Sequence, residues 1–264
     1  MNRLHQLEEE SIYLLREGFF RFERMALLWS MGKDSTTLVW LARKAFPGPL
    51  PIPVLHLDTG YKFKEIYEFR NRLTRRWKLD LRIIGNRSAL EQGMGPHRGT
   101  EECCDLLKTR ALRAGLTEHR LEAVALGIRR DEHGVRAKER FFSLRDSEGH
   151  WNYLDQPAEL WEQYATSGEA GGHIRLHPLL SWTEIDVWEY VRQERLPVVP
   201  LYFAKNGCRY RSIGCEPCCQ TVPSEATTVE EILAELAVTT TRERAGRVQD
   251  KEYAMQKLRS LGYM

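Results

Sequence analysis

A short polar turn at residues 30–35 carries the side chains best suited to holding a phosphate group. Its sequence is SMGKDS, and it lies between an apolar run at residues 25–29 and a stretch with helical apolar spacing at residues 36–45. A turn between a strand and a helix directs backbone N–H groups and the positive end of the helix dipole at its occupant. The charged and hydroxyl side chains added by this segment are Ser30, Lys33, Ser35 and Thr36. The sequence therefore predicts an anion site here.

This turn differs from the P-loop of common nucleotide-binding enzymes. The P-loop pattern G-x-x-x-x-G-K-[ST] places its lysine directly before the hydroxyl residue, whereas Asp34 separates Lys33 from Ser35. The turn resembles instead the S-x-G-x-D-S loop of the ATP pyrophosphatases, which cut ATP between its α and β phosphates and transfer AMP. A plain strand-to-helix turn with a chance glycine and a capping serine is the simpler alternative.

A second apolar run, at residues 52–57, ends in the sequence DTG at Asp58. The order strand, helix, strand with continuously apolar strands indicates a parallel sheet covered by helices on both faces. Ligands of such sheets bind beyond the carboxyl ends of the strands. Asp58 is therefore a candidate partner of a nucleotide or of its Mg²⁺, and an aspartate that only closes the turn is an equal alternative.

The rest of the chain supplies further elements of the same α/β pattern. We expect helices at residues 4–22, 63–77, 182–191 and from residue 227, and strands at residues 79–84 and 124–128. The prediction is one domain over residues 1–200, with a mostly parallel sheet and helices on both faces. A helical, cysteine-containing C-terminal region follows over residues 201–264.

Basic side chains gather in two segments. The first, residues 70–87, follows acidic residues at helical spacing, so it indicates a solvated helix face. The second, residues 129–145, has few acids to balance it, and anion binding is the expectation there. The basic residues of this second segment are Arg129, Arg130, Arg136, Lys138, Arg140 and Arg145.

The six cysteines form two pairs and two single residues. They are Cys103 with Cys104, Cys215 with Cys218, and the separate Cys208 and Cys219. A C-x-x-C turn lets two thiolates face one metal, and four thiolates suit zinc or a [4Fe–4S] cluster. Adjacent cysteines are awkward ligands for tetrahedral zinc, which favours iron–sulfur. Buried unliganded thiols, preferred for the two single residues, and a redox disulfide in the C-x-x-C are the alternatives.

Composition bounds the function only loosely. The 264 residues carry a formal net charge of +2, which requires no particular partner. The first 20 residues lack the pattern of a signal peptide, and no apolar run reaches the length of a membrane span. We therefore expect a cytoplasmic protein that does not enter a membrane, in which thiols are more common than disulfides.

Several motifs taken in order resemble the small, ATP-cleaving subunit of bacterial sulfate adenylyltransferase, within the phosphoadenylylsulfate (PAPS) reductase superfamily. They are SMGKDS at 30–35, HLDTG at 56–60, GIRRDE at 127–132, RAKER at 136–140, HPL at 177–179 with WT at 182–183, and TT at 239–240 through GR at 246–247. The resemblance spans nearly the whole chain. It implies an adenine nucleotide alpha hydrolase-like fold that uses ATP and Mg²⁺.

The resemblance also implies a role for each matching residue. Arginine suits oxyanions because its planar guanidinium binds them bidentately. Charge neutralisation, rather than a covalent nucleophile, would supply most of the catalysis. The implied nucleotide-binding residues are Ser30, Gly32, Asp34, Ser35, Thr36, Asp58, Gly127, Arg136 and Lys138. The implied catalytic residues are Lys33, Asp34, Arg129 and Arg130.

The cysteines depart from that subunit. The pair at 103–104 together with SIGCEPC at 212–218 resembles the [4Fe–4S] motif of adenylylsulfate (APS) reductases, which implies Cys103, Cys104, Cys215 and Cys218 as cluster ligands. Those reductases attack with a cysteine in a C-terminal tail. The last cysteine here is Cys219, which argues against reductive chemistry.

A third branch combines the ATP loop with a cluster. These are the ATP pyrophosphatases of DNA phosphorothioation, in the Dnd and Ssp systems, and the resemblance implies adenylation of a DNA phosphate and a cysteine desulfurase as a partner. Because it accounts for the ATP loop, the cysteines and the missing tail nucleophile, this is the leading hypothesis. The alternatives are a sulfate adenylyltransferase subunit, an APS or PAPS reductase, and a non-catalytic nucleotide-binding scaffold for a desulfurase or a GTPase-like subunit.

Overall fold

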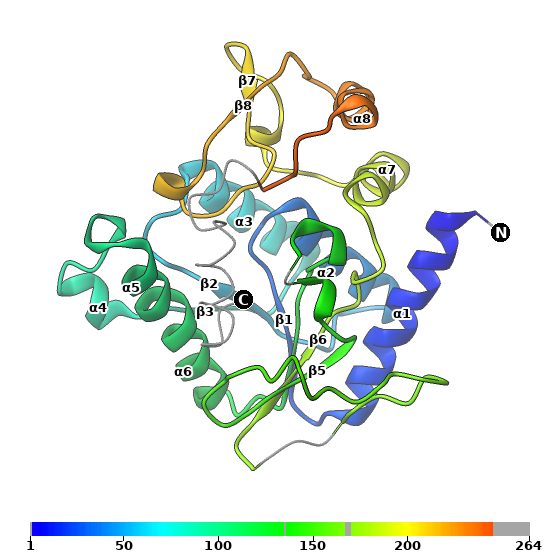
Figure 1. Cartoon of the computed structure of the whole chain (residues 1–264), viewed down its shortest axis with the longest axis vertical. Helices are drawn as coiled ribbons and strands as arrows, with labels where there is room; N and C mark the ends of the chain where they lie inside the picture. Colours follow the sequence, from blue (N-terminus) through cyan, green and yellow to red (C-terminus); the bar gives the residue numbers. More distant parts are fainter. Residues whose placement is uncertain (1, 135, 167–169, 245–264) are drawn as a thin grey trace.

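A computed structural model describes residues 2–134, 136–166 and 170–244, and its centre is a six-stranded sheet in the order β3-β2-β1-β4-β6-β5 (Figure 1). All neighbouring strands pair in parallel except β5, which runs antiparallel to β6. The strands are β1 (Met25–Leu28), β2 (Val54–Leu57), β3 (Leu81–Ile84), β4 (Ala123–Ala125), β5 (Phe142–Arg145) and β6 (His173–Leu176). The predicted mostly parallel α/β fold is confirmed.

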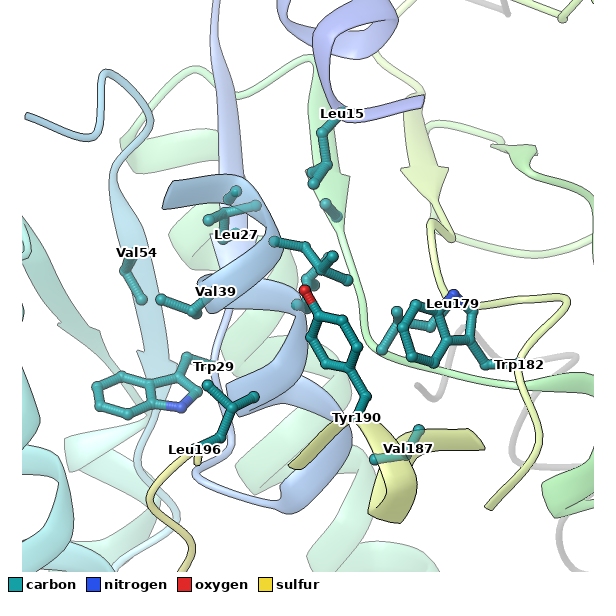
Figure 2. Packing of buried hydrophobic residues seen from close by; sticks show 14 of the residues in the cluster. Leu15, Leu27, Trp29, Val39, Val54, Leu179, Trp182, Val187, Tyr190 and Leu196 are labelled. Atoms are coloured by element: carbon teal, nitrogen blue, oxygen red, sulfur yellow. The ribbon is translucent and has the colours of Figure 1, made fainter. Parts of the chain in front are cut away.

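Helices cover both faces of the sheet, as the apolar strands predicted. Alternate residues of a strand point to opposite faces, so Leu27 and Trp29 belong to one apolar cluster and Ala26 and Leu28 to another. The first cluster, shown in Figure 2, takes side chains from α1 (Arg3–Arg21), α2 (Lys33–Ala45), α3 (Lys64–Trp77) and α7 (Glu184–Glu194). The second takes side chains from α6 (Arg110–Glu118).

Several elements lie outside the sequence prediction. The strands β5 and β6 carry Arg145 and Arg175, both buried, so neither strand has the apolar run by which a central strand is recognised. Helix α2 begins at Lys33, three residues before the predicted start, which places Ser35 in its first turn. The short helices and turns that no pattern predicted are α4 (Arg87–Glu91), α5 (Thr100–Cys104), a π-helical turn (Asp105–Thr109), and 3₁₀ turns at Pro96–Arg98, Arg130–Glu132, Arg136–Lys138, Pro200–Tyr202 and Glu216–Cys218.

The C-terminal region is small and packs on the main body. A two-stranded sheet joins β7 (Cys208–Arg209) to β8 (Val222–Pro223), and α8 (Val229–Val238) lies beside α7. Ile232 and Leu236 of α8 belong to the same apolar cluster as the strands of the main sheet. The boundary at residue 200 stays a prediction. No helix within the described residues is both long and apolar enough to cross a membrane.

The central strand generates a stability prediction. Leu27 is fully buried between β2 and β4, so Leu27→Ala leaves a cavity and lowers the free energy of unfolding by about 2–5 kcal/mol. Ile83 on the edge strand β3 is 52% exposed, so Ile83→Ala changes it by about 0.5 kcal/mol or less. Urea denaturation of both variants checks this, and equal losses would contradict the placement of β1 at the centre.

Candidate active site

A pocket lies at the carboxyl ends of β1, β2 and β4. It is lined by the predicted turn and by residues from the C-terminal region. The polar and glycine residues lining the pocket are Ser30, Gly32, Lys33, Asp34, Ser35, Thr59, Lys62, Lys108, Gly127, Glu132, Arg136, Tyr202, Ser212, Gly214, Glu243 and Arg244. The location agrees with the general rule for ligands of parallel sheets.

Hydrogen bonds within the turn fix its shape. The Oγ atoms of Ser30 and Ser35 are 3.0 Å apart, and the Ser35 hydroxyl donates to the Gly32 carbonyl at 3.1 Å. Met31 between them is buried and adopts φ 63°, a left-handed conformation that bulky residues rarely take. Such strain persists only where the surroundings impose it, and it is common at functional sites.

Gly127 allows β4 to approach the turn closely. A Cβ atom at this position would lie 2.9 Å from backbone atoms of Asp34 and Ser35. No side chain fits there without pushing the turn away. The absence of a side chain at Gly127 therefore lets the backbone after β4 pack directly against the turn. Its predicted contact with nucleotide stays a prediction.

Arg129 joins the turn to the rest of the site. Its side chain has no exposed surface, and its guanidinium donates to Asp34, Asp131 and Glu243, with the Asp131 bond at 2.9 Å. Burial alone would lower the pKa of Arg129, but the carboxylates of Glu243 and Asp131 outweigh it and raise that pKa. Arg129 therefore remains charged and acts on the pocket through its acidic partners.

Glu243 brings a buried carboxylate into the anion site. It accepts hydrogen bonds from Lys33 and Arg129, and its side chain is only 5% exposed. Burial alone would raise the pKa of Glu243, but the Arg129 and Lys33 cations hold that pKa well below its usual range. A negative group from the C-terminal segment thus lies between the two cations closest to the turn.

Five predicted site residues lie outside the pocket lining: Arg129, described above, and Asp58, Thr36, Arg130 and Lys138. The Asp58 carboxylate accepts from the Gly60 N–H and the Tyr67 hydroxyl, both at 2.9 Å, which closes the turn after β2. The Thr36 hydroxyl accepts a hydrogen bond from the Trp29 indole at 3.1 Å. The other two residues stack on aromatic rings: the Arg130 guanidinium lies 5.3 Å from the centre of the Phe141 ring, and the Lys138 Nζ lies 4.5 Å from the centre of the Tyr153 ring. Their positions do not support the predicted contacts with nucleotide.

Some lining residues had no local sequence signal. Tyr202 is buried, and its hydroxyl accepts the N–H of Lys33 at 2.9 Å, which satisfies a free donor at the start of α2. Glu132 pairs with Arg136 across the pocket wall. The motif that contains Glu243 and Arg244 contributed only to the family resemblance, and its Gly246 and Arg247 lie outside the described residues.

Three carboxylates could contribute to holding a cation. Single oxygens of Asp34, Glu132 and Glu243 lie within 4.8 Å of one another, and carboxylate oxygens are ligands that Mg²⁺ accepts. Each of these side chains already pairs with Lys33, Arg129 or Arg136. An Mg²⁺ ion arriving with a triphosphate would have to share or replace these pairs.

The four predicted metal ligands converge on one small cavity, which shares Thr59 and Lys108 with the pocket described above. It is lined by Cys103 and Cys104 from α5 and by Cys215 and Cys218 from the loop after β7. All four are buried free thiols. The Thr59 hydroxyl is 3.2 Å from the Cys215 Sγ. The structure therefore brings together the four cysteines that the sequence grouped.

The sulfurs of the described cysteines are not arranged as ligands of a single zinc ion. Four thiolates at 2.3 Å from one zinc ion would be about 3.8 Å apart, whereas within the described ranges no three cysteine sulfurs lie within 4.8 Å of one another. Burial, followed by the charges of Cys104 and Cys215, raises the pKa of the Cys103 thiol to about 11. Binding of a metal centre would therefore have to displace protons. Four thiolates are the usual ligand set of a [4Fe–4S] cluster.

The family of the chain follows from its sequence relatives. Residues 24–221 match the phosphoadenosine phosphosulfate reductase domain. The chain therefore belongs to this family, and it is an ATP pyrophosphatase-type enzyme of sulfur metabolism.

The full-length relatives are more specific. The chain is 40% identical over 300 residues to sulfate adenylyltransferase subunit 2 of Pseudomonas paraeruginosa and 38% identical over 296 residues to that of Proteus mirabilis, covering 100% of this chain and 98% of each relative. No DNA phosphorothioation protein is among these relatives, so the resemblance to the Dnd and Ssp systems gains no support.

Solved structures agree on the fold. A PAPS reductase from Candida auris superposes with a TM-score of 0.57 at 15% identity, over 84% of this chain and 98% of that one. An FMN adenylyltransferase from Candida glabrata, in complex with FMN and the ATP analogue AMPCPP, superposes with a TM-score of 0.56 at 17% identity, over 99% and 86%.

The close packing at Gly127 can be tested with one methyl group. Gly127→Ala must displace the turn, and we expect affinity for the non-cleavable analogue AMPCPP to fall about tenfold, because shifts of less than 1 Å misplace every donor in the turn. Gly134→Ala is the control, since a Cβ there has no neighbour within 4 Å. Isothermal titration calorimetry measures both. Unchanged affinity in Gly127→Ala would rule out the turn as the phosphate site.

The Glu243 carboxylate generates a second prediction. Glu243→Gln removes an anion shared by Lys33 and Arg129, so the free energy of unfolding without nucleotide should fall by about 1–3 kcal/mol. ATP should then raise the Tm more in the variant than in the wild type, because its phosphates supply the missing negative charge.

Thermal unfolding with and without ATP measures this difference. The exposed Glu230 on α8 gives a matched control, Glu230→Gln, which should behave as the wild type. An ATP-induced rise in Tm that is smaller in Glu243→Gln than in the wild type would mean that Glu243 helps to hold the nucleotide or its cation.

Proposed function

We propose that this protein transfers the adenylyl group of ATP to sulfate, forming adenylylsulfate and pyrophosphate. The observation that carries the proposal is the pocket lined by the SMGKDS turn, Gly127 and Arg136, in a chain whose full-length relatives carry the name sulfate adenylyltransferase subunit 2. The number in that name indicates that those relatives work with another subunit. We extend this to the present chain and propose that it acts together with a second subunit.

The reaction requires no covalent intermediate on the protein. One sulfate oxygen bonds to the α-phosphorus while the bond from the α-phosphorus to the α–β bridging oxygen breaks. Pyrophosphate leaves with that electron pair. Negative charge accumulates on the leaving group and on the α-phosphoryl oxygens, so positioned cations and N–H donors supply the rate enhancement.

The roles of the residues follow from where they lie. The turn hydroxyls of Ser30 and Ser35 and the N-terminus of α2 are placed to bind the pyrophosphate portion of ATP. Lys33 neutralises charge that develops on the leaving group once the nucleotide has taken the place of Glu243. Arg136, on the wall formed by the basic loop, is placed to meet the sulfate. Mg²⁺ bound to the triphosphate would add further charge neutralisation.

The choice of sulfate over DNA phosphate rests on the relatives. The hypothesis of DNA phosphorothioation, with a cysteine desulfurase as partner, rests on the combination of the ATP loop, the cysteines and the missing tail nucleophile, and the relatives named above do not add to it. A basic surface wide enough for a duplex would support it, but Arg130 and Lys138 are engaged with aromatic rings away from the pocket. Sulfate is small enough to reach the cationic side chains of one pocket, which Lys33 and Arg136 line.

We further propose that the four cysteines hold a [4Fe–4S] cluster. In this proposal residues 1–200 form the ATP domain and contribute Cys103 and Cys104, while residues 201–264 contribute Cys215 and Cys218. Their convergence in a single buried cavity supports it. The cluster would supply a structural or electron-carrying centre beside the ATP pocket.

Product analysis tests the proposed reaction. Purified protein, with its second subunit where that is required for turnover, is incubated with ATP and Mg²⁺ and either sulfate, DNA, or adenylylsulfate with a reductant. We expect pyrophosphate and adenylylsulfate in equal amounts with sulfate only. Lys33→Ala should lower the rate at least about 100-fold, and the exposed Lys64→Ala should not change it. Pyrophosphate release that depends on DNA would contradict the proposal.

Iron analysis after anaerobic purification tests the cluster separately. We expect a brown protein with about four iron and four sulfide per chain. Cys218→Ser should lose most of the iron, whereas Cys208→Ser should keep it, because Cys208 is not among the residues that line the cavity. A colourless wild-type protein that contains zinc would contradict the cluster.

A further inference from the structure

The segment from Arg211 to Cys218 is shared by the two cavities. Its middle residues Ser212, Ile213 and Gly214 line the ATP pocket, and the next residue, Cys215, lines the cysteine cavity. The chain segment that lines the ATP pocket therefore continues directly into two of the predicted metal ligands. We call residues 211–218 the shared wall.

One end of the shared wall is held by a buried ion pair. The Arg211 guanidinium donates to both carboxylate oxygens of Glu184, at 2.7 to 3.1 Å, and to the Thr241 carbonyl at 2.7 Å. Glu184 is the first residue of α7, which packs in the main core. This end is fixed to the body of the protein by contacts that do not involve a metal.

The other end carries two of the four cysteines. Within the described residues, its backbone meets the segment after β2 through a bridge between Lys62 and Cys215 and a hydrogen bond from the Glu216 N–H to the Tyr61 carbonyl at 2.8 Å, and Ile213 packs against the main core. A metal centre on Cys215 and Cys218 would tie this end covalently to α5, which carries the other two cysteines.

Two further side chains lie at the junction. Thr59 and Lys108 line both cavities, and the Thr59 hydroxyl contacts the Cys215 Sγ at 3.2 Å. A displacement of Cys215 would therefore shift Thr59 as well as the neighbouring residues 212–214, and all of these line the ATP pocket. Close-packed interiors transmit such shifts rather than absorbing them.

We infer that the metal centre on Cys103, Cys104, Cys215 and Cys218 controls the affinity of the neighbouring pocket for ATP by fixing the shared wall. This rests on the proposed cluster and deepens the proposed function: the centre acts as a switch on nucleotide binding. With the centre removed, the end at Cys215 moves and Ser212 to Gly214 line the pocket in only a fraction of the molecules. Apparent affinity falls in proportion to that fraction.

Nucleotide binding without turnover tests the inference. The full chain is loaded anaerobically with iron and sulfide, and the Kd for AMPCPP is measured by calorimetry; the same preparation is then stripped with a chelator and reloaded. We expect the Kd to rise about tenfold on stripping, as for a wall ordered in about one tenth of the molecules, and to recover on reloading. Backbone amide exchange at residues 212–214 should become faster on stripping and slow again on reloading.

Variants separate this effect from general unfolding. Cys218→Ser should reproduce the stripped state in both Kd and amide exchange, with the thermal transition of the core retained. Cys208→Ser should match the loaded wild type. An equal Kd for loaded and stripped protein overturns the inference, and so does a failure of the chain to bind any metal. Because no acceptor is present, the result stands whether or not sulfate is the true substrate.

Discussion

The buried guanidinium of Arg129 is the interaction on which the rest of the active site depends. It donates to Asp34 in the turn, to Asp131 in its own loop and to Glu243 from the C-terminal segment. The other oxygen of Asp131 accepts the N–H of Glu184 at 2.7 Å, at the start of α7. Deleting a whole charged side chain from such a buried set costs about 3–5 kcal/mol, more than a Glu→Gln exchange that keeps a hydrogen-bonding oxygen. A single cation thus holds four segments, distant in the sequence, around one pocket.

The same network explains how a site built for a highly charged ligand remains stable without it. Lys33 and Arg129 are both nearly inaccessible to water, and two buried cations without counter-charges would destabilise the fold. Asp34 and Glu243 neutralise them. In the proposed function, triphosphate oxygens would take the place of Glu243 beside Lys33, so that one anion is exchanged for another. The acidic partners therefore stabilise both buried cations.

The sequence predicted what is local and missed what depends on tertiary contact. The turn at 30–35, the strand before it, the helix after it and the helix at 182–191 follow from apolar periodicity and turn chemistry, and the structure contains them. The spacing of the four cysteines and their resemblance to a known cluster motif grouped them, although α5 and the loop after β7 are far apart in the chain. By contrast, Arg130 is the first residue of a 3₁₀ turn, and its guanidinium lies over Phe141 rather than in the pocket. No sequence pattern indicates which way the Arg130 side chain points. Tyr202 and Glu243 reach the turn only through folding.

The most direct test of adenylyl transfer to sulfate is the reaction in reverse. By microscopic reversibility, a site that binds sulfate against the α-phosphorus of ATP must also form ATP from adenylylsulfate and pyrophosphate. We therefore expect ATP to accumulate, as measured by luciferase luminescence, when the protein and its second subunit receive adenylylsulfate, pyrophosphate and Mg²⁺, and not when AMP replaces adenylylsulfate. Absence of ATP from a protein that still binds AMPCPP would contradict sulfate as the acceptor.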